Sequence, residues 1–105
     1  MAKFVFVYHG GKMSDDPEVM AAAMEAWGAW FASMGEAVID GGNPVGQSAT
    51  VNGDGSISND GGSNPTSGYS LIDAQNMDDA LAKAKNCPIL ANGGTVEVAP
   101  AIEMG

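Results

Sequence analysis

Residues 3–8 (KFVFVY) constrain the fold most, because a strand formed by them is apolar on both of its faces. Successive side chains of a β-strand point to opposite faces of the sheet. In this segment one alternating set is aromatic, and the other consists of Val5 and Val7. Strands of this kind are buried on both sides, so we expect a central strand that is covered from two directions.

A long amphipathic helix is predicted next, ending at the stop signal Gly35. Its start has two readings. Either Asp15 forms a capping box with Glu18, or Asp16 caps the helix with Pro17 at its first position. Large apolar residues recur at helical spacing, and we expect them to fill the core together with Trp30: Met20, Met24, Trp27, Phe31 and Met34.

The rest of the chain alternates between strand and helix patterns. In order, we expect a strand at 36–40, a hairpin at 50–57, a strand at 68–74, a helix at 76–86 and a strand at 95–99. The hairpin is indicated by Asn52-Gly53 and Asp54-Gly55, and the second helix by its cap residue Asn76.

This order predicts an α+β fold, a ferredoxin-like βαββαβ sandwich with an extra β-hairpin, in a single domain over residues 1–105. In that topology the first and third strands are central and both helices lie on one face of the sheet. The apolar residues on the other face then need a cover. A second copy of the chain is the simplest one, so we expect a homodimer that forms through the sheet face, a dimeric α+β barrel.

The charge of the chain excludes several classes of partner. The net charge is −9, and all four basic residues are lysines. Such a chain has no basic surface for nucleic acid or for an anionic membrane. Cys87 is the single cysteine, which rules out an internal disulfide, and residues 4–8 are too short to span a bilayer. We therefore expect a cytoplasmic protein.

Polar and glycine-rich loops are predicted to meet at one end of the sandwich. The first strand ends at His9, the parallel second strand ends at Asp40, and the antiparallel third strand begins at Tyr69 on the same edge. His9 is the single histidine, and with Asp40 or Asp60 as an orienting carboxylate it would make a general base. The alternative is a structural histidine that is hydrogen-bonded to a loop carbonyl.

Other side chains near this end are candidates for holding a small molecule. Tyr69, Asn43 and Asn64 could hydrogen-bond a ligand, and Trp30 could wall its pocket.

Three further features of the sequence are weaker candidates for a binding site: a phosphate loop, a calcium loop and a zinc site. Gly10-Gly11-Lys12 precedes a helix, but it lacks the full phosphate-loop spacing and is followed by two aspartates. Residues 52–62 have the Asp/Asn/Gly texture of a calcium loop, but Ile57 stands where the turn glycine belongs and no glutamate closes the loop. With one histidine and one cysteine the chain has too few soft ligands for zinc, and Cys87 fits a small buried residue better than a nucleophile. We expect no metal and no cofactor.

Several segments together resemble the YCII-related, or DGPF-domain, superfamily. They are "KFVFVYHGG", "SNDGG" with "GYSLIDAQNMDDALAKAKNCP", and "GGTVEVAP", and the resemblance covers nearly the whole chain. It implies a dimeric α+β barrel of bacterial origin, related to small-molecule enzymes such as a dehydrochlorinase and the muconolactone isomerases.

Two departures limit what the resemblance implies about chemistry. The DGPF stretch reads Asp60-Gly61-Gly62-Ser63 in this chain, so its first half alone matches. The enzymatic branch is similar in using a histidine on the first helix with an aspartate after the second, and Trp27 and Cys87 occupy those places. That mechanism is therefore not implied.

Two hypotheses about function follow. The first is a small-molecule enzyme that transfers protons, with isomerase- or lyase-like chemistry on an aromatic or lactone-like substrate and His9 as its base. The second is a non-catalytic small-ligand-binding or dimeric scaffold module, in which the same loops bind a ligand or seal the pocket.

Overall fold

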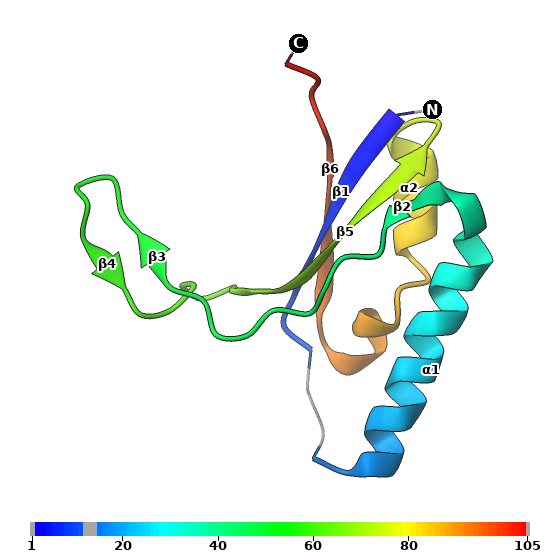
Figure 1. Ribbon diagram of the computed structural model, residues 1–105, viewed down its shortest axis with the longest axis horizontal. Coiled ribbons are helices and arrows are strands. Elements are labelled where there is room, and N and C mark those ends of the chain that lie inside the picture. The colour runs from blue at the N-terminus through cyan, green and yellow to red at the C-terminus, as the bar shows by residue number, and fades with distance from the viewer. Residues whose placement is uncertain (1, 12–14, 105) are drawn as a thin grey trace.

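The computed structural model describes residues 2–11 and 15–104, which form an α+β fold with two helices against a four-stranded antiparallel sheet (Figure 1). Its elements are β1 (Ala2–His9), α1 (Pro17–Met34), β2 (Val38–Asp40), β3 (Thr50–Val51), β4 (Ile57–Ser58), β5 (Thr66–Ala74), α2 (Met77–Ala84) and β6 (Thr95–Pro100). Short 3-10 helices lie at Gly35–Ala37 and Pro88–Asn92.

The strand order β2-β5-β1-β6 confirms the ferredoxin-like topology expected from the sequence. The central strands β1 and β5 are antiparallel, with Phe4 opposite Ile72 and Phe6 opposite Ser70. β2 pairs with β5 and β6 pairs with β1, so these two strands form the edges. The extra hairpin is also present, as a separate two-stranded sheet of β3 and β4.

Side-chain caps fix the start of each helix. The Asp16 carboxylate accepts a hydrogen bond from the Glu18 amide at 2.9 Å with Pro17 in the first turn, which is the second of the two starts considered above. Asn76 caps α2 by accepting from the Asp79 amide at 2.9 Å. The chain turns at Gly35 after α1, as the sequence predicts.

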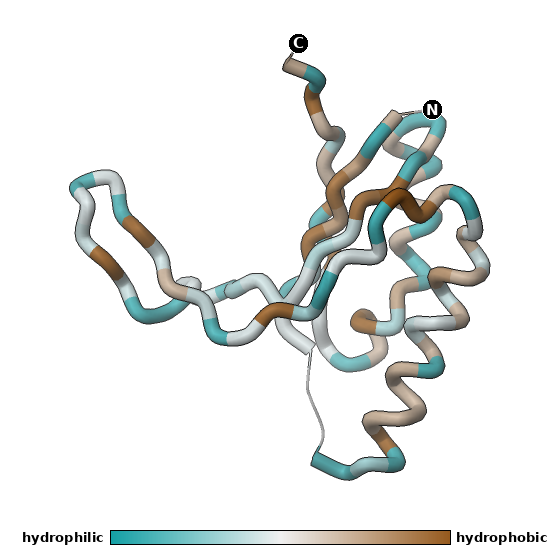
Figure 2. The backbone as a smooth tube through the Cα atoms, in the orientation of Figure 1, coloured by the Kyte–Doolittle hydropathy of each residue, from teal (hydrophilic) through white to brown (hydrophobic). Residues whose placement is uncertain are grey.

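The core lies between the sheet and the helices. Every second residue of β1 and β5 faces the helices, and Phe6 and Ile72 are completely buried there. Trp30 is buried against this layer, where Trp27 and Phe31 extend the aromatic cluster. Figure 2 shows apolar stretches along the central strands.

The expectation that Met20 and Met24 fill the core is wrong. Both are exposed, Met24 to 73%, whereas Met34 packs against the core. Helical spacing places all three residues on one side of α1, but that side is covered only where the helix crosses the sheet. The first turns of α1 extend past the end of the sheet in Figure 1, so in the described part of the chain the sheet does not cover this end of the helix.

The opposite face of the sheet carries no helix in the described part of the chain (Figure 1). We call it the helix-free face. Val5 and Val7 of β1 point to it, together with their cross-strand neighbours Leu71 and Tyr69 on β5. The valines and Leu71 are half-buried in the single chain, and Tyr69 is 38% exposed. The cover that the sequence predicts for the second face of β1 is therefore not supplied by the helices.

Within residues 2–11 and 15–104, neither helix has the length and hydropathy needed to cross a bilayer.

Candidate functional site

His9 ends β1 at a point where the pairing with β5 shifts register. Tyr8 lies opposite Gly68, whereas His9 lies opposite Thr66, so a bulge separates the two residues. Bulges re-aim the side chains next to them. Gly94 packs against this strand end so closely that an added Cβ would lie 2.7 Å from the His9 carbonyl oxygen. The end of β1 is thus fixed by two neighbouring segments.

Both ring nitrogens of His9 have partners. Nδ1 lies 3.0 Å from the backbone carbonyl oxygen of Asn64, and Nε2 lies 2.9 Å from Oε1 of Glu97. A carbonyl oxygen only accepts, so Nδ1 carries a proton and donates it. A carboxylate also only accepts, so the contact with Glu97 requires one more proton, either on Nε2 or on the carboxyl group. A proton in this contact can be carried by either His9 or Glu97.

The two members of the pair differ in exposure. The side chain of His9 is 12% exposed and that of Glu97 is 69% exposed. The ring is held in place on its Nδ1 side by the loop before β5, while the carboxylate on its Nε2 side stands in solvent. A molecule that approaches from the solvent can therefore reach Nε2 when the Glu97 side chain rotates away. This arrangement can transfer a proton to or from such a molecule.

Glu97 is the residue that sequence reasoning missed. The carboxylate in contact with His9 belongs to Glu97, a residue of a strand. The sequence suggests the loop residues Asp40 or Asp60 for this position. The one local signal is the alternation in TVEVA, which places Glu97 on the polar face of a strand but does not give its register. Once β6 is paired with β1, Glu97 lies opposite Val7 and diagonal to His9.

The two aspartates hold turns. Oδ1 of Asp40 accepts from the Gly42 amide at 2.8 Å, and Oδ1 of Asp60 accepts from the Gly62 amide at 3.1 Å. Each is a side-chain bond to the backbone two residues on, the pattern of an Asx turn. Gly42 has φ +72°, and a side chain there would collide with the Tyr69 carbonyl. Asp40 therefore shapes the loop that enters the site region.

The expected ligand-binding residues lie in different places. Asn64 contributes its backbone carbonyl to His9, and Tyr69 lies on the helix-free face opposite Val7. Asn43 is exposed in the loop after β2, next to Gly68. Trp30 is 5% exposed on the helix side, where its indole N–H donates to the Lys83 carbonyl at 3.0 Å. The sheet thus separates Trp30 from His9.

The structure also describes Cys87 and part of the Gly10-Gly11-Lys12 motif. Cys87 is buried as expected, and burial raises the pKa of its thiol to about 11. Gly10 and Gly11 both have positive φ directly after β1, while Lys12 lies outside the described residues. Among the described residues, no three His, Cys, Asp or Glu side chains gather closely enough to hold a metal ion.

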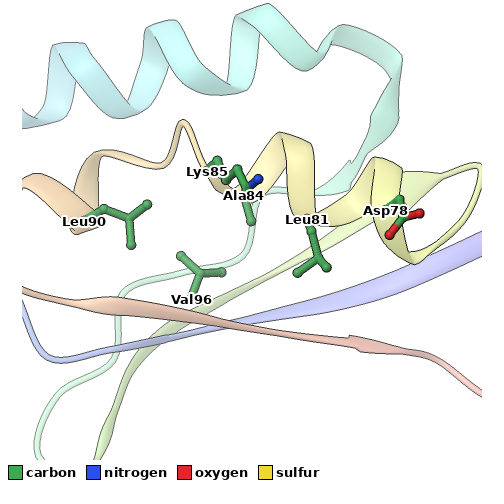
Figure 3. Close-up of a pocket in the computed structure, with 6 residues that line it drawn as sticks. All are labelled: Asp78, Leu81, Ala84, Lys85, Leu90 and Val96. Carbon is green, nitrogen blue, oxygen red and sulfur yellow. The ribbon is translucent and has the colours of Figure 1, made fainter.

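Two open concavities lie on the helix side of the molecule. One, of about 440 Å³, lies between α2 and β6 and is lined by Leu81, Leu90 and Val96 among others (Figure 3). The other, of about 610 Å³, lies between α1 and α2 with Trp30 in its wall. Neither includes His9 or Glu97. The His9–Glu97 pair therefore lies outside these two concavities.

Comparison with known proteins gives a likeness of fold. No protein-family model and no curated protein sequence matches the chain. Among solved structures, the chain is similar to 5-chloro-2-hydroxyhydroquinone dehydrochlorinase (TftG) from Burkholderia phenoliruptrix AC1100, in complex with 2,5-dihydroxybenzoquinone. The match has a TM-score of 0.55 at 16% sequence identity and covers 96% of this chain and 95% of that chain. The chain therefore shares an α+β ferredoxin-like fold with a small-molecule enzyme.

Proposed function

We propose that this protein is a member of the YCII-related superfamily that acts on a small organic molecule by proton transfer at the His9–Glu97 pair. The observation that carries the proposal is the contact between Nε2 of His9 and Oε1 of Glu97 at 2.9 Å, with the Glu97 side chain 69% exposed to solvent. An imidazole paired with a carboxylate is a common proton-transfer arrangement.

His9 supplies the exchangeable proton, and its surroundings set the orientation of the ring. The Asn64 carbonyl keeps a proton on Nδ1, which leaves Nε2 as the nitrogen that exchanges one with substrate. Glu97 contacts this nitrogen and acts with His9 as the second group that takes or gives the proton. Tyr69, on the same face of the sheet, is positioned to contact a bound ring. Asp40 and Asp60 act by holding the turns, and Asn43 lies in the first of these loops.

The substrate class is an aromatic or lactone-like compound. The fold neighbour, a dehydrochlorinase in complex with 2,5-dihydroxybenzoquinone, supports this choice. The apolar helix-free face beside His9 would accept such a ring.

We further propose that the working form is a homodimer in which a second copy covers the helix-free face. Val5, Val7 and Leu71 would then be buried on both sides, as the sequence of β1 predicts. The cover would also enclose the His9–Glu97 pair and exclude water from it, which strengthens its electrostatic interactions.

A thermal-shift screen tests the function without an assumed mechanism. Phenols, quinones, lactones and organic acids are added to the wild-type protein, and a compound that binds the folded state raises the melting temperature. Compounds that bind are then tested for turnover with wild type, His9→Gln and Glu97→Gln. We expect both variants to lose turnover by about 100-fold or more, the usual contribution of a general acid–base group. Glu103→Gln, the same change at an exposed glutamate, is the matched control.

A second candidate function is a non-catalytic small-ligand-binding or dimeric scaffold module. It is favoured by the two acceptors on His9, which satisfy the ring within the chain, and by the absence of His9 from both described concavities. Stabilising compounds that wild type does not convert would favour this function. Turnover that survives in His9→Gln would contradict the proposed role of His9.

A further inference from the structure

The segment 46–62, which we call the arm, is a hairpin that stands apart from the rest of the fold. β3 and β4 pair with each other, and neither makes more than marginal contact with any other helix or strand of the described residues. Its tip is closed by hydrogen bonds from the Asn52 amide to the Ser56 carbonyl at 2.7 Å and from the Gly55 amide to the Asn52 carbonyl at 2.9 Å. The arm is thus shaped by local contacts without support from the body.

The arm has one polar face and one apolar face. On the polar face, the side-chain amide of Asn52 (Nδ2) donates to Ser58 Oγ at 3.2 Å, and Thr50 Oγ1 donates to the Asp60 carbonyl at 2.8 Å. On the other face Val51 and Ile57 are cross-strand partners and are 72% and 66% exposed. Figure 2 shows these apolar stretches on both strands of the hairpin. An isolated two-stranded hairpin is at best marginally stable in water, so this apolar face needs a surface to pack on.

The direction of the arm indicates which surface that is. In Figure 1 the arm extends to the left, away from both helices and on the side of the helix-free face. The helix-free face of the sheet and the arm therefore lie at an angle to each other, and we call the space beside both the corner. The radius of gyration is 15.0 Å, whereas about 13 Å is typical of a compact domain of this length. A molecule that covers the helix-free face would lie in this corner, beside the arm.

The area of the sheet gives a second reason to include the arm. Strands of these lengths, about 4.8 Å apart with about 3.3 Å per residue, present a face of roughly 400 Å². Two copies in contact through this face alone would bury roughly 800 Å², whereas specific interfaces bury about 1,000 Å² or more. The face alone is marginal. Two arms, each with an exposed valine–isoleucine pair, would supply further apolar area.

We propose that the arm of each copy reaches along a second copy of this chain and packs its Val51–Ile57 pair on that copy. The inference rests on the homodimer of the proposed function and adds the arm as its clasp. A two-fold axis buries both arms and both helix-free faces at once. The described arm carries Asp54 and Asp60 and no basic residue, on a chain with a net charge of −9. The contact is therefore apolar, and added salt strengthens it by screening the repulsion.

Sedimentation equilibrium of arm variants tests the clasp. Val51→Lys with Ile57→Lys places a charge on each member of the apolar pair. Lysine reduces the net negative charge, so any weakening of the dimer comes from the lost apolar contact. The matched control is Gly46→Lys with Gly53→Lys, because both glycines have open space around them and neither has positive φ. We expect the first variant to raise the dimer dissociation constant by about 10-fold or more and the control to leave it near that of wild type.

Photo-crosslinking locates the contact. A benzophenone maleimide is attached to Gly53→Cys at the tip of the arm. The native Cys87 competes little for the label because it is buried. Labelled chains are mixed with ¹⁵N-labelled unmodified chains, and we expect crosslinks between the two isotopic forms. The arm variants should keep the circular dichroism spectrum and melting behaviour of a folded monomer, since the body does not depend on the arm.

The outcomes separate this inference from the proposed function. If wild type and both lysine variants dimerise equally, or if crosslinks form only within one chain, the clasp is overturned while the sheet-face dimer stands. A wild-type protein that stays monomeric overturns the dimer and the clasp together, and leaves the chemistry proposed for His9 to the turnover assay.

Discussion

At the scale of single residues, the ring of His9 is defined by two acceptors, the Asn64 carbonyl at 3.0 Å and Glu97 at 2.9 Å. The contact with Glu97 makes a specific prediction for Glu97→Gln. The glutamine amide can donate to Nε2, so the neutral ring with its proton on Nδ1 satisfies both contacts. Ring ¹⁵N chemical shifts at matched pH should therefore differ between this variant and wild type, with the Nδ1–H tautomer favoured in the variant.

The control for this prediction is Glu103→Gln, which removes a carboxylate far along the chain from His9. Its ring ¹⁵N shifts should equal those of wild type. Equal shifts in wild type and Glu97→Gln would mean that Glu97 does not contact Nε2 of His9 in solution.

A buried chain of hydroxyl groups makes a second prediction. The Tyr8 hydroxyl donates to Ser70 Oγ at 2.7 Å, and Ser70 Oγ donates to the Gly41 carbonyl at 2.6 Å. Ser70→Ala leaves the Tyr8 hydroxyl buried without its acceptor, which costs about 1–3 kcal/mol, whereas Tyr8→Phe removes one bond and costs about 1 kcal/mol. Urea denaturation should show the larger loss of unfolding free energy for Ser70→Ala. The reverse order would contradict the assigned direction of the bonds.

Cys87 predicts how stability depends on pH. Burial raises the pKa of its thiol from the ordinary 9.0 to about 11 in the folded protein. The unfolded chain therefore releases this proton first, and stability is complete below pH 9 and falls between pH 9 and 11. From pH 8.5 to 10, wild type should lose about 1 kcal/mol more unfolding free energy than Cys87→Ala. Equal losses in chemical denaturation would show that the thiol is not buried.

A feature of the site could be predicted only where it depends on strand order or on residues close in sequence. The position of His9 at the loop-rich end depends on the strand order alone, and this end of the sheet could be predicted. The partner of His9 depends on the register between β1 and β6, which lie almost the whole chain apart, and on a bulge beside Tyr8. No local pattern encodes either feature, so Glu97 was missed.

At the scale of elements, the start of each helix was predictable because caps are local. Asp16 with Pro17, and Asn76 with Asp79, lie within a few residues of the bonds they make. Which part of α1 would be buried was not predictable, because periodicity gives a face and not the length of the surface beneath it. The first turns of α1 extend past the sheet (Figure 1).

Two methionines on α1 test this difference with the same chemical change. Met24 is 73% exposed, whereas Met34 packs against the core. We expect Met24→Ala to change the free energy of unfolding by less than about 0.5 kcal/mol, and Met34→Ala to lower it by roughly 1–2 kcal/mol. Denaturant titrations of both variants give the comparison. A large loss for Met24→Ala would mean that its side chain is covered in solution.

At the scale of the whole molecule, the fold could be predicted because the order of strands and helices allows few topologies. The sequence predicts that the helix-free face needs a cover, but it does not predict what covers it. Val5 and Val7 show that β1 is built for burial on two sides, but the chain itself supplies one helical layer. In the proposed dimer the second side is covered by another copy of the chain, and no local pattern of the sequence specifies that contact.

Sedimentation equilibrium of wild type beside Val5→Lys tests most directly whether the helix-free face is the working surface. Val5 lies in the middle of that face, opposite Leu71 and Ala99, and the matched control is Val19→Lys on the exposed side of α1. We predict that wild type and Val19→Lys are dimers at micromolar concentration, and that Val5→Lys is a folded monomer. A monomeric wild type, or a Val5→Lys protein that dimerises as tightly as wild type, would contradict the account.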